Sequence, residues 1–386
     1  MTNERLLYCL NGVDERFILK ADPARRYVRP QFRLAALAAC LCLVFGGIFA
    51  VVRQIVPSAP FDPSLPHVSL PETLSEEGGG GSGLGTYFDG DSLICSLLPD
   101  ERELPEALPV YRSGVFSPDG TVRGLTKAGM RERLEQALSA LEPDTAPLPP
   151  YVFGDDRTPS LNVKAAGTSV RVTADGTVDI TFDNGLPLPD RYVFRSDSSD
   201  AEALAALGWL TERYSDLLGF AEPSPFTTAS RLYSGEAQRS YLVCDASCGG
   251  IIVGYSLRCA RFFPDENGAL KRILLTDGLT AAEKLGDYPL ITEKEAENKL
   301  LAGKYLSLSP VRVPGRKYIL GADIVYLNGP GVQTLMPFYR FYVCLPYELL
   351  PEELERTPLG TAKENGLKVC GIYYVPAIDG RYISRG

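Results

Sequence analysis

A run of nineteen residues without a charged side chain, Leu34–Val52, constrains this chain more than any other feature. A helix rises about 1.5 Å per residue and the hydrocarbon core of a bilayer is about 30 Å thick, so about twenty apolar residues cross it. The run therefore predicts one transmembrane helix at residues 34–53. A cleavable signal peptide has a shorter apolar core near the N-terminus, whereas 33 residues precede this run.

A possible lipidation motif lies inside the run, because Leu37-Ala38-Ala39-Cys40 is similar to a lipoprotein cleavage box. Such a box follows its apolar core, yet twelve uncharged residues come after Cys40. We therefore expect an uncleaved anchor rather than lipidation at Cys40.

The charges on either side of the run predict its orientation. Residues 1–33 carry seven basic and four acidic side chains, a net charge of +3, and four of the basic ones lie in the ten residues before the run. The positive-inside bias places residues 1–33, the head of the chain, in the cytoplasm. The residues after the run are then expected outside the membrane. The whole chain has a net charge of −9, so the remainder carries about −12 and would repel nucleic acid.

Residues 54–87 have the composition of a linker. Prolines recur between Pro57 and Pro71, and four glycines follow at residues 78–81. Prolines stiffen a linker and glycines loosen it, so we expect a stalk that is stiff near the membrane. No Gly-Lys-Ser/Thr follows the glycines, which excludes a phosphate-binding loop of that type.

Beyond the linker, short amphipathic helices and alternating strands predict an α+β fold. Helices should begin after Thr126, Ser199 and Thr292, the last two with capping boxes. A hairpin is expected over residues 169–182, turning at Asp175-Gly176. Further strands are expected at residues 240–244, 251–263, 270–276, 317–327, 338–345 and 367–375.

Each predicted helix has one apolar face, so each must pack on a sheet, and runs of helix and hairpin are typical of short helices on antiparallel meander sheets. Prolines between Phe220 and Ala229 suggest a division into two packed subdomains, residues 88–220 and 221–386.

Six of the nine cysteines follow the transmembrane run, at positions 95, 244, 248, 259, 344 and 370. A bridge between Cys344 and Cys370 is the most plausible one if the strands around them pair antiparallel, and buried thiols are the alternative. Their spacing does not match a zinc ribbon or a redox C-x-x-C motif. We expect no metal site and no cofactor.

The chain offers little catalytic chemistry. Its single histidine, His67, lies in the expected stalk, where it cannot be held against a nucleophile, so Ser-His-Asp, Cys-His and histidine–zinc sites are not expected. Asp175, Asp183 and Asp277 each lie in a turn-like context with a nearby glycine, which favours turns over paired catalytic carboxylates. We expect no enzyme activity, with a carboxylate hydrolase as the least favoured alternative.

The aromatic segment Phe338–Val343 has two interpretations. Alternation in a strand places Phe338, Arg340 and Tyr342 on one face and Tyr339 on the other. In the first interpretation these residues form core with a paired arginine. In the second, Tyr339, Arg340 and Tyr342 are a candidate partner surface, because tyrosine and arginine are frequent interface hot spots.

Two segments resemble known extracytoplasmic regulators. Thr292-Glu293-Lys294-Glu295-Ala296 resembles the opening of PepSY-like modules, and residues 335–343 and 371–377 are similar to the terminal sheet of YycH/YycI-type proteins. The latter are single-pass Gram-positive membrane proteins that restrain a sensor histidine kinase from outside. Residues 6–26 followed by the span also resemble uncharacterised clostridial single-pass proteins, some of which regulate sigma factors. The resemblance implies a regulatory role and identifies no partner.

We therefore expect a single-pass protein of the cell membrane, with a cytoplasmic N-terminus and a non-enzymatic extracellular region that binds a partner and modulates signalling. The bilayer and a membrane protein such as a sensor kinase or sigma-factor system are the expected partners. The alternative is an envelope module that binds peptide or glycan or inhibits a peptidase.

Overall fold

The computed structural model describes residues 61–71, 74, 84–87, 104–116, 122–141, 152–153, 159–231, 236–329, 331–351 and 358–384. They belong to one compact unit, Phe61–Gly386. The expected cytoplasmic head, the transmembrane helix at residues 34–53 and Cys95 lie outside the described residues. No helix within the described ranges is long and apolar enough to cross a membrane.

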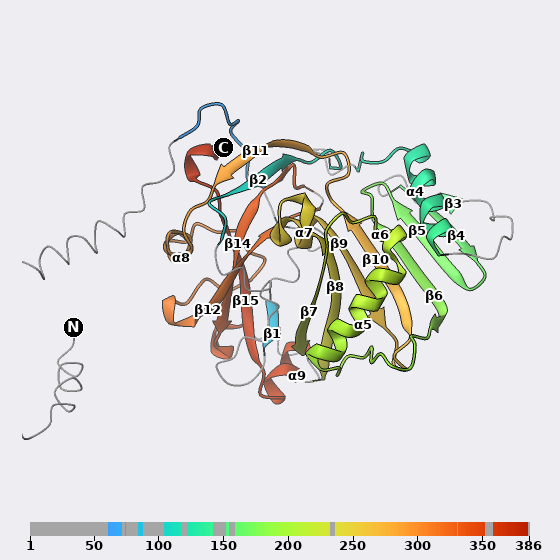
Figure 1. Ribbon diagram of the computed structural model, residues 1–386. Coiled ribbons are helices and arrows are strands. Elements are labelled where there is room, and N and C mark those ends of the chain that lie inside the picture. The colour runs from blue at the N-terminus through green and yellow to red at the C-terminus, as the bar shows by residue number, and fades with distance from the viewer. Residues whose placement is uncertain are drawn as a thin grey trace, which may run out of the picture. The chain divides into compact units, whose positions relative to one another are not determined.

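An eight-stranded antiparallel sheet forms one half of this unit (Figure 1). Its spatial order is β3 (Val152–Phe153), β4 (Ser160–Ala165), β5 (Thr168–Thr173), β6 (Val178–Leu186), β10 (Leu270–Asp277), β9 (Arg258–Pro264), β8 (Ala237–Asp245) and β7 (Pro223–Arg231). The predicted hairpin is confirmed, with Val170 opposite Ile180. The sheet runs across the subdomain boundary expected at residue 220, because β6 pairs with β10.

Three helices cover one face of this sheet: α4 (Lys127–Ala140), α5 (Asp200–Arg213) and α6 (Ser215–Leu218). The predicted capping box is present, since Ser199 and Glu202 exchange hydrogen bonds at the start of α5. Gly219 ends α6 with φ 57°, a conformation that glycine adopts without strain. Leu134 of α4 and Leu207 and Leu210 of α5 are fully buried against the sheet. Amphipathic faces therefore fix these helices, as their sequence predicts.

A four-stranded antiparallel sheet forms the other half, in the order β1 (Leu84–Tyr87), β15 (Lys368–Pro376), β14 (Pro337–Leu345) and β12 (Ile319–Tyr326). α8 (Glu293–Leu301) follows the predicted capping box at Thr292, and α9 (Pro358–Glu364) precedes β15. A small sheet of β11 (Glu283–Pro289), β2 (Ala107–Arg112) and β13 (Thr334–Leu335) adjoins this half. β14 and β15 are buried over most of their length, so both faces of this sheet are covered.

Part of the expected linker belongs to the folded unit. Val68 is buried, donates to the carbonyl of Tyr382 at 2.9 Å and accepts from Ser384 at 2.9 Å. Phe61 stacks on the Tyr382 ring with 5.0 Å between centroids. Tyr288 also donates to the carbonyl of Pro66 at 2.7 Å. The apolar side chains between the prolines, which composition alone treats as linker, therefore anchor residues 61–71.

One predicted strand is wrong. Residues 251–263 were expected to be a single strand, but Ile251–Leu257 is helix α7 and the strand β9 begins only at Arg258. Gly249 and Gly250, with φ of 122° and 91°, redirect the chain after β8. The helix packs in the core of the four-stranded sheet on one side and against Phe226 and Leu242 on the other. A segment buried all round has no amphipathic period, so the apolar run alone cannot separate helix from strand.

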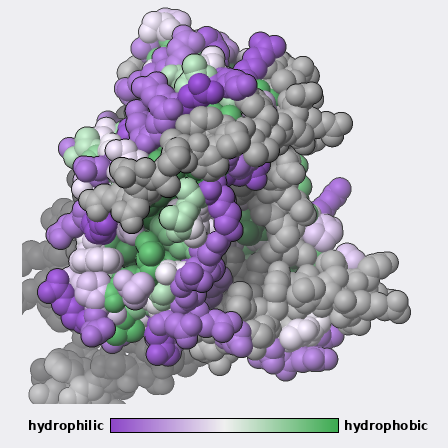
Figure 2. All heavy atoms as spheres, turned by 90° about the vertical axis from the view of Figure 1, so that its right-hand side faces the viewer, coloured by the Kyte–Doolittle hydropathy of each residue, from purple (hydrophilic) through white to green (hydrophobic). Residues whose placement is uncertain are grey.

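The described residues thus form an α+β fold of short helices on antiparallel sheets, as the sequence predicts. On the side that carries α4 and the β3 to β6 end of the large sheet, hydrophilic residues surround a smaller area of hydrophobic ones (Figure 2). The described residues on this face are therefore mainly hydrophilic.

Candidate functional site

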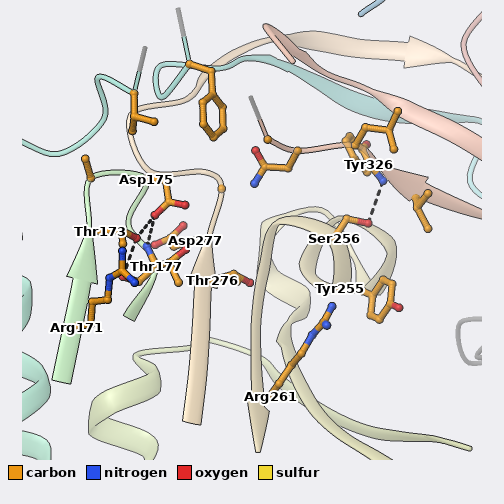
Figure 3. A pocket seen from close by; sticks show the side chains of 18 of the residues that line it. Arg171, Thr173, Asp175, Thr177, Tyr255, Ser256, Arg261, Thr276, Asp277 and Tyr326 are labelled. Carbon is orange, nitrogen blue, oxygen red and sulfur yellow. Dashed lines mark hydrogen bonds between the residues drawn. The ribbon is translucent and has the colours of Figure 1, made fainter. Parts of the chain in front are cut away.

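A cavity of about 450 Å³ is lined by both large sheets and by α7 (Figure 3). Its polar lining residues are Arg171, Thr173, Asp175, Thr177, Arg261, Thr276 and Asp277 from the eight-stranded sheet, Tyr255 and Ser256 from α7, and Tyr326, Asn328 and Arg340 from the other half. Cavities between packed units are common ligand sites. This one brings together residues that are more than 150 positions apart.

The β5–β6 turn forms a rigid part of the cavity wall. The Asp175 carboxylate accepts hydrogen bonds from the backbone of Thr177 at 2.9 Å and from the hydroxyl of Thr173. Gly176 has φ 88°, and a Cβ there would lie 2.7 Å from the hydroxyl of Thr280. The sequence predicted this turn correctly, but its position beside the cavity depends on the pairing of β6 with β10.

An ion pair supports the neighbouring part of the wall. Both terminal nitrogens of Arg133, on α4, lie 3.3 Å from Oδ2 of Asp277 at the end of β10. The two side chains are 23% and 15% exposed, so the pair is partly shielded from solvent. The structure therefore gives Asp277 a charge partner in addition to the turn role that its sequence context indicates.

α7 reaches the cavity because Asp245 holds the chain that precedes it. The buried Asp245 carboxylate accepts from the backbone of Ala221, Glu222 and Ser247 at 3.1–3.3 Å and from the Ser247 hydroxyl at 2.6 Å. Burial raises the pKa of Asp245, but these hydrogen bonds outweigh it and leave the pKa below its ordinary value. From α7, Ser256 accepts from the backbone of Tyr326 at 3.0 Å and ties the helix to β12.

Arg340 connects the cavity to the core of the four-stranded sheet. Its guanidinium donates to both carboxylate oxygens of Asp323, at 2.9 and 2.5 Å, and the Tyr342 hydroxyl donates to the same carboxylate at 3.1 Å. The Asp323 side chain is 5% exposed. Burial alone would lower the pKa of Arg340, yet the charge of Asp323 raises it well above its ordinary value. The arginine therefore stays charged beside the cavity.

The three residues expected to form a partner surface have different positions. Tyr339 is 2% exposed and donates to the carbonyl of Ile291 at 2.8 Å, and Tyr342 is also 2% exposed. Burial raises the pKa of Tyr339 above its ordinary value. Arg340 is the one of the three that lines the cavity. These contacts match the first interpretation of the segment, core with a paired arginine.

The two cysteines of the expected bridge are brought together. Cys344 lies directly opposite Cys370 in the antiparallel pairing of β14 and β15. Both are thiols in this structure, with Cys344 half-buried and Cys370 buried. The antiparallel condition on which the predicted pairing depended is therefore met.

Outside its ion pairs, the cavity wall carries two arginines, Arg171 and Arg261, against one carboxylate, Asp175, and this balance favours an anionic group. Asp277 and Arg340 have partners of opposite charge, Arg133 and Asp323. Arg171 and Arg261 form no ion pair with any other described residue and are both exposed. Arg171 on β5 and Arg261 on β9 lie three strand positions apart in the sheet, so each guanidinium by itself can donate paired hydrogen bonds to a carboxylate or similar anion. Sequence reasoning missed both arginines, because neither strand shows a local motif.

His67 is exposed and is not part of the cavity wall. Within the described ranges, no group of three or more His, Cys, Asp and Glu side chains is placed to hold a metal ion. A comparison of the sequence with models of protein families gives no match, and a comparison with curated proteins gives none either. The similarity to PepSY and YycH/YycI-type modules therefore stays a prediction.

Proposed function

We propose that this chain is a single-pass membrane protein whose extracellular α+β region is a non-enzymatic sensing module that regulates a signalling partner. The observation that carries the proposal is the cavity, because a ligand bound there would contact β5, β9 and β10 on one side and α7, β12 and β14 on the other. A ligand that binds one arrangement of these elements more tightly than another shifts the population toward it.

The span supplies the route to the cell interior. Leu34–Val52 has the length and apolarity of a transmembrane helix, and the basic head favours a cytoplasmic N-terminus. A change in the outer region can then reach a membrane partner through helix contacts in the bilayer or through contacts of the outer region itself. A sensor kinase or a sigma-factor system would be a suitable partner.

A second function, the binding of envelope peptides or glycans without signalling, is favoured by the composition of the cavity. Arg171 and Arg261 suit a carboxylate, and the lining of the same cavity includes the apolar residues Val325 and Leu327. Peptide fragments of a cell wall combine both features.

The first prediction tests regulation in the native host. Deleting residues 88–386, and separately scrambling Leu34–Val52 into another apolar span, should each change transcription of the genes that the partner controls. The deletion removes the outer region with its cavity, and the scrambled span removes the helix contacts within the bilayer. Transcript profiling of the two strains provides the measurement, and unchanged profiles in both would contradict a regulatory role.

A topology control is needed for this experiment. Protease added to intact cells should remove the C-terminal region and spare an epitope tag at the N-terminus, whereas permeabilised cells should lose both. Full resistance in intact cells, or recovery of the chain in the soluble fraction, would contradict the proposed anchor.

The second prediction concerns the cavity. Soluble cell-wall peptides should bind the full-length chain in detergent saturably, and Arg261→Ala should weaken their affinity about 10- to 100-fold, because a charge-assisted hydrogen bond contributes about 1.5–3 kcal/mol. Calorimetric titration measures the affinity. Arg312→Ala is the matched control, since Arg312 is exposed and outside the cavity wall. Equal affinities for the two variants would exclude Arg261 from the binding site.

A further inference from the structure

The described part of the chain contains two cross-strand pairs of cysteines. Cys344 lies opposite Cys370 in β14 and β15, and Cys244 lies opposite Cys259 in β8 and β9. Opposed residues of antiparallel strands have Cα atoms about 4.5–5.5 Å apart, and disulfides span about 4.4–6.8 Å. Register alone therefore permits a bridge at either pair.

The two pairs differ in their exposure to solvent and in the pKa of their thiols. Cys344 is half-buried and within reach of solvent, whereas Cys244 and Cys259 are 0% and 2% exposed. A hydrogen bond with Cys370 lowers the pKa of Cys344 to about 6. Burial raises the pKa of Cys259 to about 12. The thiolate is the nucleophile in disulfide exchange. Cys344 can therefore start the exchange at neutral pH, whereas the buried pair Cys244 and Cys259 cannot.

We propose that Cys344 and Cys370 form a redox-active dithiol, which a small-molecule disulfide converts into a cross-strand disulfide while Cys244 and Cys259 remain reduced. The site stands apart from the proposed regulatory role and does not depend on it. Its basis is the placement of one accessible and one buried cysteine opposite each other on the two central strands of the four-stranded sheet.

The chemistry balances with glutathione disulfide as the oxidant. The Cys344 thiolate attacks one sulfur of glutathione disulfide, forms a mixed disulfide and releases one glutathione thiolate. Cys370 then gives its proton to that thiolate and attacks Sγ of Cys344, which displaces the second glutathione. Two protein thiols are oxidised to one disulfide, and one glutathione disulfide is reduced to two thiols.

The groups around Cys344 set its response to pH. On β15, Cys370 contributes the hydrogen bond and Lys368 a positive charge, and both lower the pKa of Cys344. After β14, burial and then the nearby Cys344 raise the pKa of Tyr347. Nζ of Lys363, on α9, lies 5.6 Å from the centre of the Tyr347 ring. On β15, Tyr373 lies near Cys370.

The third prediction is tested on the full-length chain, purified with a reductant in detergent and then incubated with glutathione disulfide at neutral pH. The remaining thiols are alkylated, first in the folded state and then after unfolding, and peptides are mapped by mass spectrometry. We expect a peptide linked through Cys344 and Cys370, with Cys244 and Cys259 alkylated only after unfolding. A glutathione adduct that stays at Cys344 without the linked peptide, or linkage of Cys244 to Cys259 at the same rate, would overturn the proposal.

The pH dependence gives a second measurement. The rate of iodoacetamide labelling at Cys344 should reach half its maximum near pH 6 in the reduced protein. Cys370→Ala removes the hydrogen-bond partner and should move this midpoint upward. A wild-type midpoint near 9.0, the ordinary pKa of a thiol, would show that Cys370 does not stabilise the thiolate and would contradict the proposed order of attack.

Discussion

Asp323→Asn is expected to lower the free energy of unfolding by about 3 kcal/mol, the lower end of the cost of breaking a buried ion pair, because it leaves the Arg340 guanidinium, whose side chain is 18% exposed, without its counter-charge. Asp323 accepts both hydrogen bonds of the Arg340 fork and a third from Tyr342. Asparagine keeps the size of the side chain but removes the negative charge and replaces one acceptor with a donor that faces Arg340. Denaturant unfolding followed by circular dichroism measures the loss.

Two further variants show whether the loss comes from the buried charge. Removing both partners in Asp323→Leu with Arg340→Met should recover much of the stability, since apolar replacements of a buried pair are often neutral. Glu283→Gln is the matched control, because Glu283 pairs with Arg112 across β11 and β2 in the same opposed register but with 65% and 60% of the side chains exposed. It should cost less than about 1 kcal/mol. Equal losses for Asp323→Asn and Glu283→Gln would contradict the role assigned to burial.

The sequence predicts those features of the fold that depend on neighbouring residues, but not the pairing of Asp323 with Arg340. Strand alternation places Arg340 and Tyr342 on one face, and Asp323 lies in a segment predicted as a strand. Capping boxes at Ser199 and Thr292 and the turn at Asp175-Gly176 depend on neighbouring residues only, which is why they were predicted correctly. The pairing of Asp323 with Arg340 requires the register of β12 on β14, and no local pattern encodes it.

The cavity could not be predicted for the same reason, because it depends on which strands pair. Arg171 and Arg261 lie on strands with ordinary alternation, and they line the same cavity only because β6 pairs with β10 across about ninety residues of chain. The cysteines are an intermediate case, since the sequence makes their pairing depend on antiparallel strands and the structure supplies both the pairing and the register. α7 is the opposite case, because an apolar segment buried on both sides carries no period from which helix could be inferred.

Gly254→Ala should lower the free energy of unfolding by about 3 kcal/mol, near the upper end of typical overpacking costs. A Cβ at Gly254 would lie 2.5 Å from the carbonyl oxygen of Asp245 and 3.0 Å from its carbonyl carbon. These are backbone atoms, so they cannot rotate away as the end of a flexible side chain can. Relief requires α7 to move from β8, which disturbs the hydrogen bonds that the Asp245 carboxylate accepts and carries Tyr255 and Ser256 away from the cavity. Unfolding curves measure the first effect, and peptide titration measures the second.

Gly208→Ala provides the matched control for this steric argument. Gly208 lies within α5, and a Cβ there would meet no atom within 4 Å. Alanine is the better helix former by about 0.8–1.0 kcal/mol, so this substitution should raise the free energy of unfolding. The two changes add the same methyl group to a helix, and helix propensity favours both. A loss of stability for Gly254→Ala with a gain for Gly208→Ala would therefore show that the close approach of α7 to Asp245 causes the loss. A gain in stability for Gly254→Ala would mean that α7 is not packed against that backbone.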